Sequence, residues 1–284
     1  MPLLLTIMLF AALGGIASAA LAVVFLWVRE EHSVLILPHF VSFATGALLG
    51  AALLALLPEA IEGAGAGGAH GIGLALIAGL GVFFLIEKLV LWWHAHAHVG
   101  DADAAACPQH ADEAVEAQAV HRHRHDPGDT HHGRDHASGV LVLVGDSLHN
   151  ALDGALIAAA FLGSARLGVL TTFAVAAHEI PHRVGDFAIL VQAGLSRPRA
   201  LLLNLATGIA AVLGAAIAYF ALRQTQHVLP YALAVAAAGF LYIAVAGLIP
   251  GLHRRADPRT SVTQVIFIAA GIAVIAVAER LTGQ

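Results

Sequence analysis

The sequence predicts an all-α membrane protein with eight transmembrane helices. Of its 284 residues, 59% are hydrophobic and only 12% are charged, whereas an ordinary soluble domain has about 25% charged residues. The apolar residues gather in eight segments, each of about 20 residues or more, which is the length that crosses a bilayer as a helix. Backbone groups in lipid must bond to one another, so each segment is expected to be helical.

The eight segments follow one another with short polar or glycine-rich breaks between most of them. The first segment lacks the basic start of a signal peptide and exceeds a signal core of about 7–15 residues, so we expect it to span the membrane. The segments are Leu3–Val28, Val34–Ala60, Ile72–Trp93, Gly139–Leu162, Leu167–Ala193, Ala200–Leu222, Leu229–Ile249 and Val262–Leu281.

The arginines predict the orientation of these helices, because cytoplasmic loops carry an excess of Lys and Arg. With both termini outside, nine loop arginines face the cytoplasm and three face outward, and we therefore expect both termini outside. The nine are Arg29, Arg122, Arg124, Arg134, Arg197, Arg199, Arg254, Arg255 and Arg259, and the three are Arg166, Arg223 and Arg280.

One long polar segment divides the chain into three helices at 1–95, a cytoplasmic loop at 96–137, and five helices at 138–284. The loop is rich in histidine, of which the chain has 18 against 14 Lys plus Arg. Its apolar content is too low for it to fold alone, so we expect it to be disordered. His-rich tracts often bind metal ions, and both metal binding and a plain solvated linker stay open for this loop.

A run of polar side chains interrupts the fourth segment. His149 and Asp153 are four residues apart, which places both on one face of a helix, with Asn150 beside them. Imidazole, carboxylate and amide groups form a mixed set that suits Zn²⁺, Fe²⁺ or Mn²⁺. Gly154 is expected to let a neighbouring helix approach closely. Ionisable groups cost roughly 2.5–3.5 kcal/mol each at bilayer depth, so we expect a function for this run.

The fifth segment repeats the pattern with His178, Glu179 and His182. The loop between the two segments is short, so their helices should be antiparallel neighbours. Both polar runs lie at similar distances from this loop and therefore at a similar depth. We expect the two runs to face each other and to bind a divalent metal ion between them.

Arg183 and Asp186 follow the second run, three residues apart. We expect both to serve in structural ion pairs. The two can pair with each other, or Arg183 can neutralise Asp153 or Glu179 when no metal is bound. An arginine beside the ligands also raises the cost of a bound dication, because like charges repel.

The two runs together resemble the ZIP family of zinc- and iron-regulated-transporter-like proteins, in the branch whose fifth helix reads His-Glu-x-Pro-His. The runs in question are His149–Gly154 and His178–Phe187. Leu56–Ala60, Glu87-Lys88 and Gly239–Pro250 resemble parts of the family's second, third and seventh helices. The resemblance extends over the whole chain, including the eight helices, the outside termini and the His-rich loop.

This resemblance implies a transporter that moves divalent metal ions into the cytoplasm, Zn²⁺ first and Fe²⁺, Mn²⁺ or Cd²⁺ as alternatives. It also implies an elevator-type motion of a helix bundle against a scaffold. The histidines look like ligands of the main site, the acids can bridge, and the asparagine belongs to a neighbouring site. The implied metal ligands are His149, Asn150, Asp153, His178, Glu179 and His182.

The chain departs from the family pattern at Arg183, where many relatives have an acidic residue. Ala51 and Ala55 in the second helix, and Gly247 and Gly251 in the seventh, also stand where relatives often have an acid or a histidine. The pathway is therefore less negative, and we expect a single metal ion rather than two.

Two other functions remain as alternatives to a transporter. The His178-Glu179-x-x-His182 spacing is also that of zinc proteases, and Leu152-Asp153-Gly154 imitates a third-ligand motif of intramembrane proteases. Against this, Pro181 lies inside the motif and the Leu-Asp-Gly run precedes it, so we expect no enzyme. A transport-impaired metal-sensing membrane protein is the other alternative.

The composition also bears on partners and location. No basic stripe tracks phosphates, so we expect no nucleic-acid partner. The expected partners are the metal ion, as substrate, and the lipid bilayer, and a homodimer is left open. The Arg- and Ala-rich, Lys-poor composition favours a bacterium with GC-rich codons and hence the bacterial inner membrane.

Overall fold

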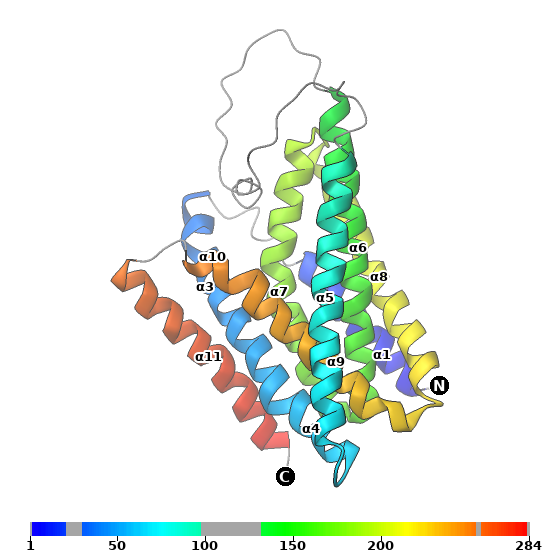
Figure 1. Cartoon of the computed structure of the whole chain (residues 1–284). Helices are drawn as coiled ribbons and strands as arrows, with labels where there is room; N and C mark the ends of the chain where they lie inside the picture. Colours follow the sequence, from blue (N-terminus) through cyan, green and yellow to red (C-terminus); the bar gives the residue numbers. More distant parts are fainter. Residues whose placement is uncertain (1, 21–29, 98–131, 254–256, 283–284) are drawn as a thin grey trace, which may run out of the picture.

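The computed structural model describes residues 2–20, 30–97, 132–253 and 257–282, and every element in these ranges is helical (Figure 1). The fold class is therefore the all-α class that the apolar segments predict. The elements are α1 (Pro2–Ala12), η1 (Leu13–Ala17), α3 (Glu30–Gly50), η2 (Ala51–Leu56), α4 (Leu57–Ala64), α5 (Ala69–Ala97), α6 (His132–Gly163), α7 (Ala165–Gln192), α8 (Arg197–Leu222), η3 (Gln226–Val228), α9 (Leu229–Tyr242), η4 (Ile243–Leu248), α10 (Ile249–His253) and α11 (Pro258–Thr282).

Six helical stretches in the described ranges are long and apolar enough to cross a membrane. They correspond to the first three and the last three of the eight expected segments. α6 and α7, with 32 and 28 residues, have sufficient length as well, but their polar runs lower their mean hydropathy. The two helices that carry the predicted metal ligands are thus the ones that differ from ordinary lipid-facing spans.

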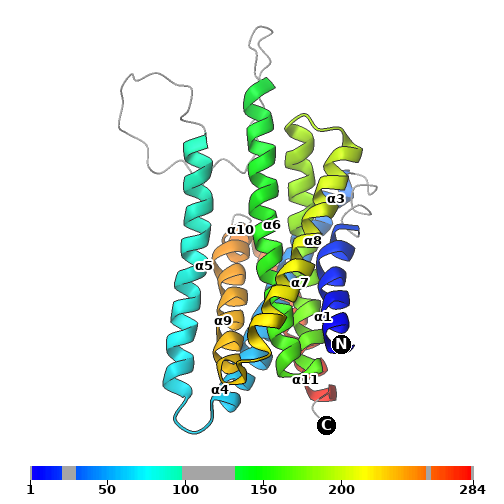
Figure 2. The same ribbon diagram turned by 90° about the vertical axis from the view of Figure 1, so that its right-hand side faces the viewer.

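The long polar loop is bordered by helix on both sides. α5 continues to Ala97 and α6 begins at His132, so helix extends into both ends of the range 96–137. Residues 98–131, with most of the loop histidines, lie outside the described residues. The start of α1 and the end of α11 lie at the same end of the molecule, opposite the ends of α5 and α6 that border this loop (Figures 1 and 2).

The helices pack as two units. α1, η1, α6, α7 and α8 contact one another and form what we call the site unit. The remaining helices form the flanking unit, in which α3 packs on α11 and α5 packs on α9, as Figures 1 and 2 show. The two units meet mainly where α3 contacts α7 and where α9 contacts α6.

Glycines set the closest helix contact in the site unit. A Cβ added at Gly154 would lie 1.8 Å from the carbonyl oxygen of Ala211 on α8, and one added at Gly214 would lie 1.9 Å from that of Ala151 on α6. α6 and α8 therefore touch backbone to backbone, which confirms the close approach that Gly154 predicts. This contact fixes the position of α6 along the axis of the helix bundle, and with it the depth of its polar run.

Candidate metal site

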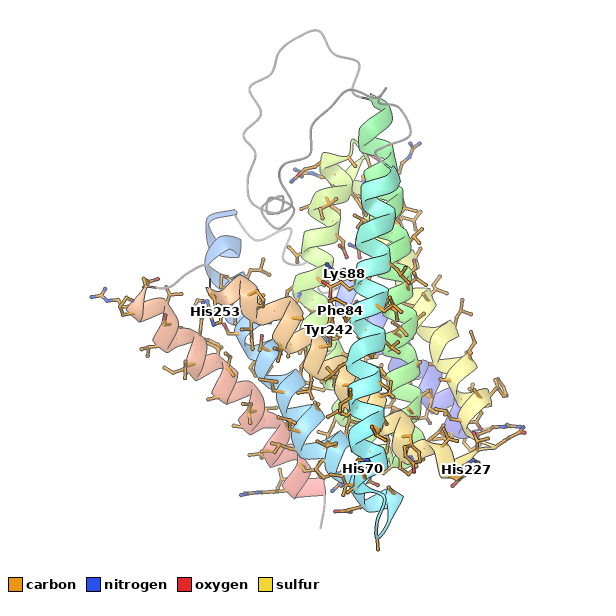
Figure 3. The ribbon with its side chains drawn as sticks, viewed as in Figure 1. His70, Phe84, Lys88, His227, Tyr242 and His253 are labelled. Atoms are coloured by element: carbon orange, nitrogen blue, oxygen red, sulfur yellow. The ribbon has the colours of Figure 1, made fainter. Side chains whose placement is uncertain are left out.

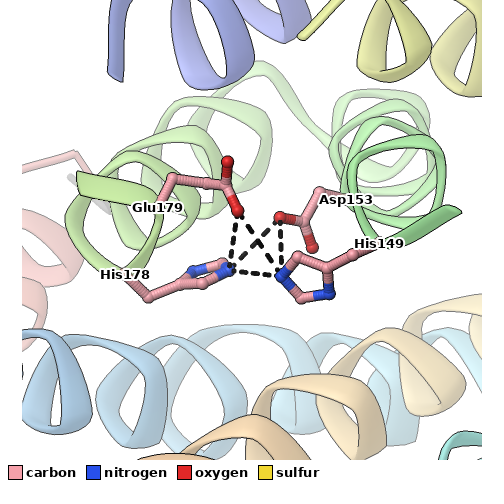
Figure 4. Close-up of side chains that lie close together, drawn as sticks. All are labelled: His149, Asp153, His178 and Glu179. Carbon is pink, nitrogen blue, oxygen red and sulfur yellow. Dashed lines mark hydrogen bonds and ion pairs between the residues drawn. The ribbon is translucent and has the colours of Figure 1, made fainter. Parts of the chain in front are cut away.

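Four side chains from α6 and α7 converge at one point between these helices (Figure 4). His149 and Asp153 lie on successive turns of α6, and His178 and Glu179 are neighbours on α7. The Nε2 atoms of the two histidines are 3.4 Å apart. Asp153 Oδ2 lies 3.2 Å from Nε2 of His178 and 3.8 Å from Nε2 of His149. Glu179 Oε1 lies 3.5 Å from Nε2 of His149 and 3.9 Å from Nε2 of His178.

These separations have the size of the edges of a metal-ligand tetrahedron. Zinc bonds to nitrogen and oxygen are about 2.0–2.2 Å long, which puts tetrahedral ligand atoms about 3.3–3.6 Å apart. The separations between the four atoms given above range from 3.2 to 3.9 Å. A divalent ion therefore fits among these atoms after only small side-chain shifts.

Three of the four converging atoms have lone pairs available to a cation. Nδ1 of His178 lies 3.1 Å from the carbonyl oxygen of Ala174, and because a carbonyl only accepts, Nδ1 donates and leaves the lone pair of the neutral ring on Nε2. Asp153 Oδ2 and Glu179 Oε1 are buried and have no hydrogen-bond partner within the described residues. Buried oxygens without a partner cost free energy, so a cation at this point would stabilise the cluster.

His182, another predicted ligand, lies beside this cluster. Its ring stacks on that of His149 with 5.3 Å between the centroids, but its Nδ1 bonds to Asp186 Oδ2 at 2.9 Å. Asp186 thus pairs with His182, and not with Arg183, the partner that the sequence suggested for it. The side chain of His182 is 46% exposed, whereas that of His178 is 2% exposed, so His182 stands at the rim of the site.

Arg183 is fully buried next to the cluster and is held by groups from three helices. Its Nε donates to Glu179 Oε2 at 2.8 Å, and its Nη1 donates to Asp146 Oδ2 at 2.7 Å. On α8, Nη1 also donates to the backbone carbonyl of Asn204 at 3.0 Å and to the hydroxyl of Thr207. Of the ion pairs that the sequence allows for Arg183, the one with Glu179 is present.

Comparison with known proteins agrees with the motifs. The family model described as ZIP zinc transporter matches residues 2–279, which is nearly the whole chain. The chain belongs to the ZIP zinc transporter family. Zinc transporter SLC39A7 of Rattus norvegicus is 33% identical over 97% of this chain and 73% of its own length. Zinc transporter ZIP13 of Homo sapiens is 34% identical over 87% of this chain and 72% of its own.

Asp146 is a polar residue of this ZIP chain that the sequence did not single out. It is buried, and besides Arg183 it accepts the side-chain amide of Asn150 at 2.9 Å on Oδ1. Asn150 therefore contacts Asp146 and Arg183, to which it presents its oxygen, and lies outside the four-residue cluster. The signal was present in the sequence, because Asp146, Asn150 and Asp153 are spaced by four and three residues and so share one helix face.

Polar residues elsewhere in this ZIP chain make contacts away from the cluster. Tyr242 on α9 donates its hydroxyl to Glu87 on α5, and Lys88 Nζ lies 5.8 Å from the centroid of the Phe84 ring, in the region labelled in Figure 3. Glu87 therefore links two helices of the flanking unit. Figure 3 also shows His70 and His227 near the lower end of the molecule and His253 at the end of α10.

Proposed function

We propose that this chain transports divalent metal ions across a lipid bilayer, with Zn²⁺ as its principal substrate. The observation that carries the proposal is the cluster of His149, Asp153, His178 and Glu179 between α6 and α7. Apolar helices long enough to cross a membrane accompany the cluster, and the relatives named above are zinc transporters. The cluster is the point at which a metal ion would be held during its passage.

The donor atoms of the cluster support the choice of metal. Two imidazole nitrogens and two carboxylate oxygens make a borderline set that suits Zn²⁺, Fe²⁺ and Mn²⁺ better than Cu(I). Four ligand atoms at tetrahedral separations favour Zn²⁺ among these ions. Competition of Fe²⁺, Mn²⁺ and Cd²⁺ with Zn²⁺ uptake would rank them directly.

We propose that an elevator-type motion carries the metal into the cytoplasm, and the packing of the two units supports such a motion. All four side chains of the cluster belong to the site unit. The flanking unit presents an apolar side chain to the cluster, since the Phe240 ring centroid lies 6.5 Å from that of His178. A metal ion that is held by one unit alone can travel with this unit past the other without exchanging ligands.

Zinc uptake into liposomes that contain the purified full chain tests the proposal. Changes outside the direct ligands of a metal commonly cost about 10–100-fold in affinity, so removing a ligand with His178→Ala should nearly abolish uptake. His227→Ala, which removes an exposed histidine far from the cluster, should leave uptake unchanged. Deleting residues 99–136 should alter uptake without abolishing it. Wild-type uptake by His178→Ala would contradict the assignment of the site.

The surroundings of Glu179 disfavour the protease alternative. A zinc protease needs this glutamate free to take a proton from a metal-bound water. Here Oε1 faces the cluster, Oε2 accepts a bond from Arg183, and Pro181 interrupts the helix hydrogen bonding within the motif. We expect no cleavage of a membrane-embedded peptide by the purified chain, and cleavage that Glu179→Gln removes would revive the protease.

The chain is an integral membrane protein, and its composition supports a finer location. It is rich in Ala and Arg and poor in Lys, which fits a bacterium with GC-rich codons. We propose the bacterial inner membrane on this ground. Recovery of the chain in the outer-membrane fraction of its host would contradict this location.

A further inference from the structure

The carboxylate of Glu179 faces two cation positions at once. Its Oε1 lies 3.5 Å from Nε2 of His149 in the metal cluster, and its Oε2 lies 2.8 Å from Nε of Arg183. A carboxylate that offers one oxygen to each side has the geometry of a bridge between two neighbouring cations. One position is the metal cluster, and the guanidinium of Arg183 fills the other.

The groups around the guanidinium are oxygen ligands of the kind that divalent ions prefer. Besides Glu179 Oε2, they are Asp146 Oδ2 at 2.7 Å, the side-chain oxygen of Asn150, and the backbone oxygen of Asn204 at 3.0 Å. Carboxylate, amide and backbone oxygens form the usual set for hard divalent ions. All of these residues are nearly or fully buried, so an empty position among them would leave uncompensated negative charge.

Charge counting agrees with a single metal ion in this arrangement. Asp146, Asp153 and Glu179 contribute three negative charges, and Asp186 is paired separately with His182. Arg183 and one divalent ion contribute three positive charges, so the buried group is neutral. A second divalent ion beside Arg183 would leave two excess positive charges in a low-dielectric interior, where like charges repel strongly.

We propose that Arg183 is a built-in cation that occupies the position of a second metal ion and thereby limits the cluster to one divalent ion. This inference rests on the proposed function, because it concerns the number of ions at the same cluster. Arg183 acts as a positioning residue as well. Its bond to Glu179 Oε2 turns the other oxygen of this carboxylate toward the histidines.

The number of Zn²⁺ ions bound per full-length chain, measured by equilibrium dialysis and elemental analysis, tests the inference. Arg183→Glu changes the count to four negative charges, which two divalent ions balance, so this variant should bind one ion more than the wild type. Arg183→Lys keeps the positive charge and should bind the same number as the wild type. A folded Arg183→Glu variant that binds no additional ion would overturn the inference, as would a gain of one ion in Arg183→Lys.

Two further variants serve as controls for the number of bound Zn²⁺ ions. Arg199→Glu reverses the charge of an exposed arginine on α8 and should leave the count unchanged, so a gain there would also overturn the specific role of Arg183. His178→Ala should bind one ion fewer than the wild type. Any ions that the other histidines of the chain bind are the same in both and cancel in the comparison. If His178→Ala binds as many ions as the wild type, the proposed site fails, and this outcome is distinct from a failure at Arg183.

Anomalous diffraction at the zinc edge tests the inference on the wild-type chain, whether or not Arg183→Glu folds. Crystals grown with saturating Zn²⁺ should show a single peak between α6 and α7, with Arg183 still bonded to Glu179. Paired metals that share a carboxylate lie about 3.5–4 Å apart. A second peak at this distance, with the guanidinium displaced, would overturn the inference.

Discussion

Asp146 and Arg183 form a buried ion pair that joins α6 to α7 beside the metal cluster. Their side chains are 2% and 0% exposed, so both charges have lost their hydration, at a cost of several kcal/mol per ion. The pair is stable only because further bonds complete it, from Asn150 to Asp146 and from Arg183 to Asn204 on α8. Removal of Arg183 would leave Asp146 without a counter-ion, and removal of Asp146 would take from the buried guanidinium one of its two carboxylate partners.

Asp146→Ala should therefore destabilise the protein strongly, although Asp146 is outside the predicted ligand set. Breaking one side of a buried pair costs about 3–5 kcal/mol, and we expect a clear drop in the midpoint of thermal unfolding in detergent. Asp146→Asn keeps the shape of the side chain and an acceptor oxygen for Arg183, and should be more stable than Asp146→Ala. An unfolding midpoint equal to that of the wild type in Asp146→Ala would show that the pair contributes little.

Helical spacing predicted some neighbours within the site and left others undecided for a definite reason. The separation of four residues placed His149 and Asp153 on one face, and the structure has them together. His182 has possible partners four residues away on both sides, His178 and Asp186, and spacing cannot decide between them. In the structure its ring bonds to Asp186 at 2.9 Å, because a carboxylate accepts the ring proton.

At the level of helices, the contact between α6 and α8 determines where the site lies. Gly154 and Gly214 allow each helix to approach a carbonyl oxygen of the other, and small residues of this kind favour close helix packing in lipid. The same contact brings Asn204 and Thr207 on α8 within reach of Arg183. The packing of α8 thus determines the depth of the cluster in the bundle and stabilises the ion pair beside it.

Gly154→Ala should separate α6 from α8 and weaken metal transport together with stability. The added methyl group would overlap the carbonyl oxygen of Ala211 at 1.8 Å, and overpacking of this kind typically costs about 1–3 kcal/mol. Gly81→Ala on α5 is a matched control, since a Cβ there meets open space and alanine favours helix. Both variants would be compared in their midpoint of thermal unfolding and in their zinc uptake. Equal values for the two variants would contradict the role of the contact.

The order of helices was predictable from hydropathy, but their partners were not. Within the described residues each apolar segment is helical, since a lipid-facing backbone has no other way to satisfy its polar groups. Asn204 and Thr207 on α8 both bond to Arg183, a contact that the sequence did not predict. This contact depends on which helix packs against α6, and the spacing within one helix carries no information about that choice.

For the whole molecule, Arg166 is a polar link between the two units. It lies on the first turn of α7 in the site unit, and its Nη2 is 3.0 Å from Glu279 on α11 and 3.9 Å from Glu59 on α4. All three side chains are partly buried, so dissolved salt screens their attraction less than it would at full exposure. If the site unit moves past the flanking unit during transport, these residues must separate in every cycle.

A cross-link between positions 166 and 279 should therefore stop transport. In a chain with Cys107→Ser, the pair Arg166→Cys and Glu279→Cys would be joined by a cleavable bifunctional thiol reagent, and zinc uptake into liposomes measured before and after cleavage. Uptake should be lost on cross-linking and return on cleavage, because the link ties α7 to α11.

The control pair Glu87→Cys and Tyr242→Cys lies entirely within the flanking unit, where the native side chains are hydrogen-bonded, and its cross-link should leave uptake intact. Full uptake with the first pair joined would rule out relative motion of the units at this end and with it the elevator.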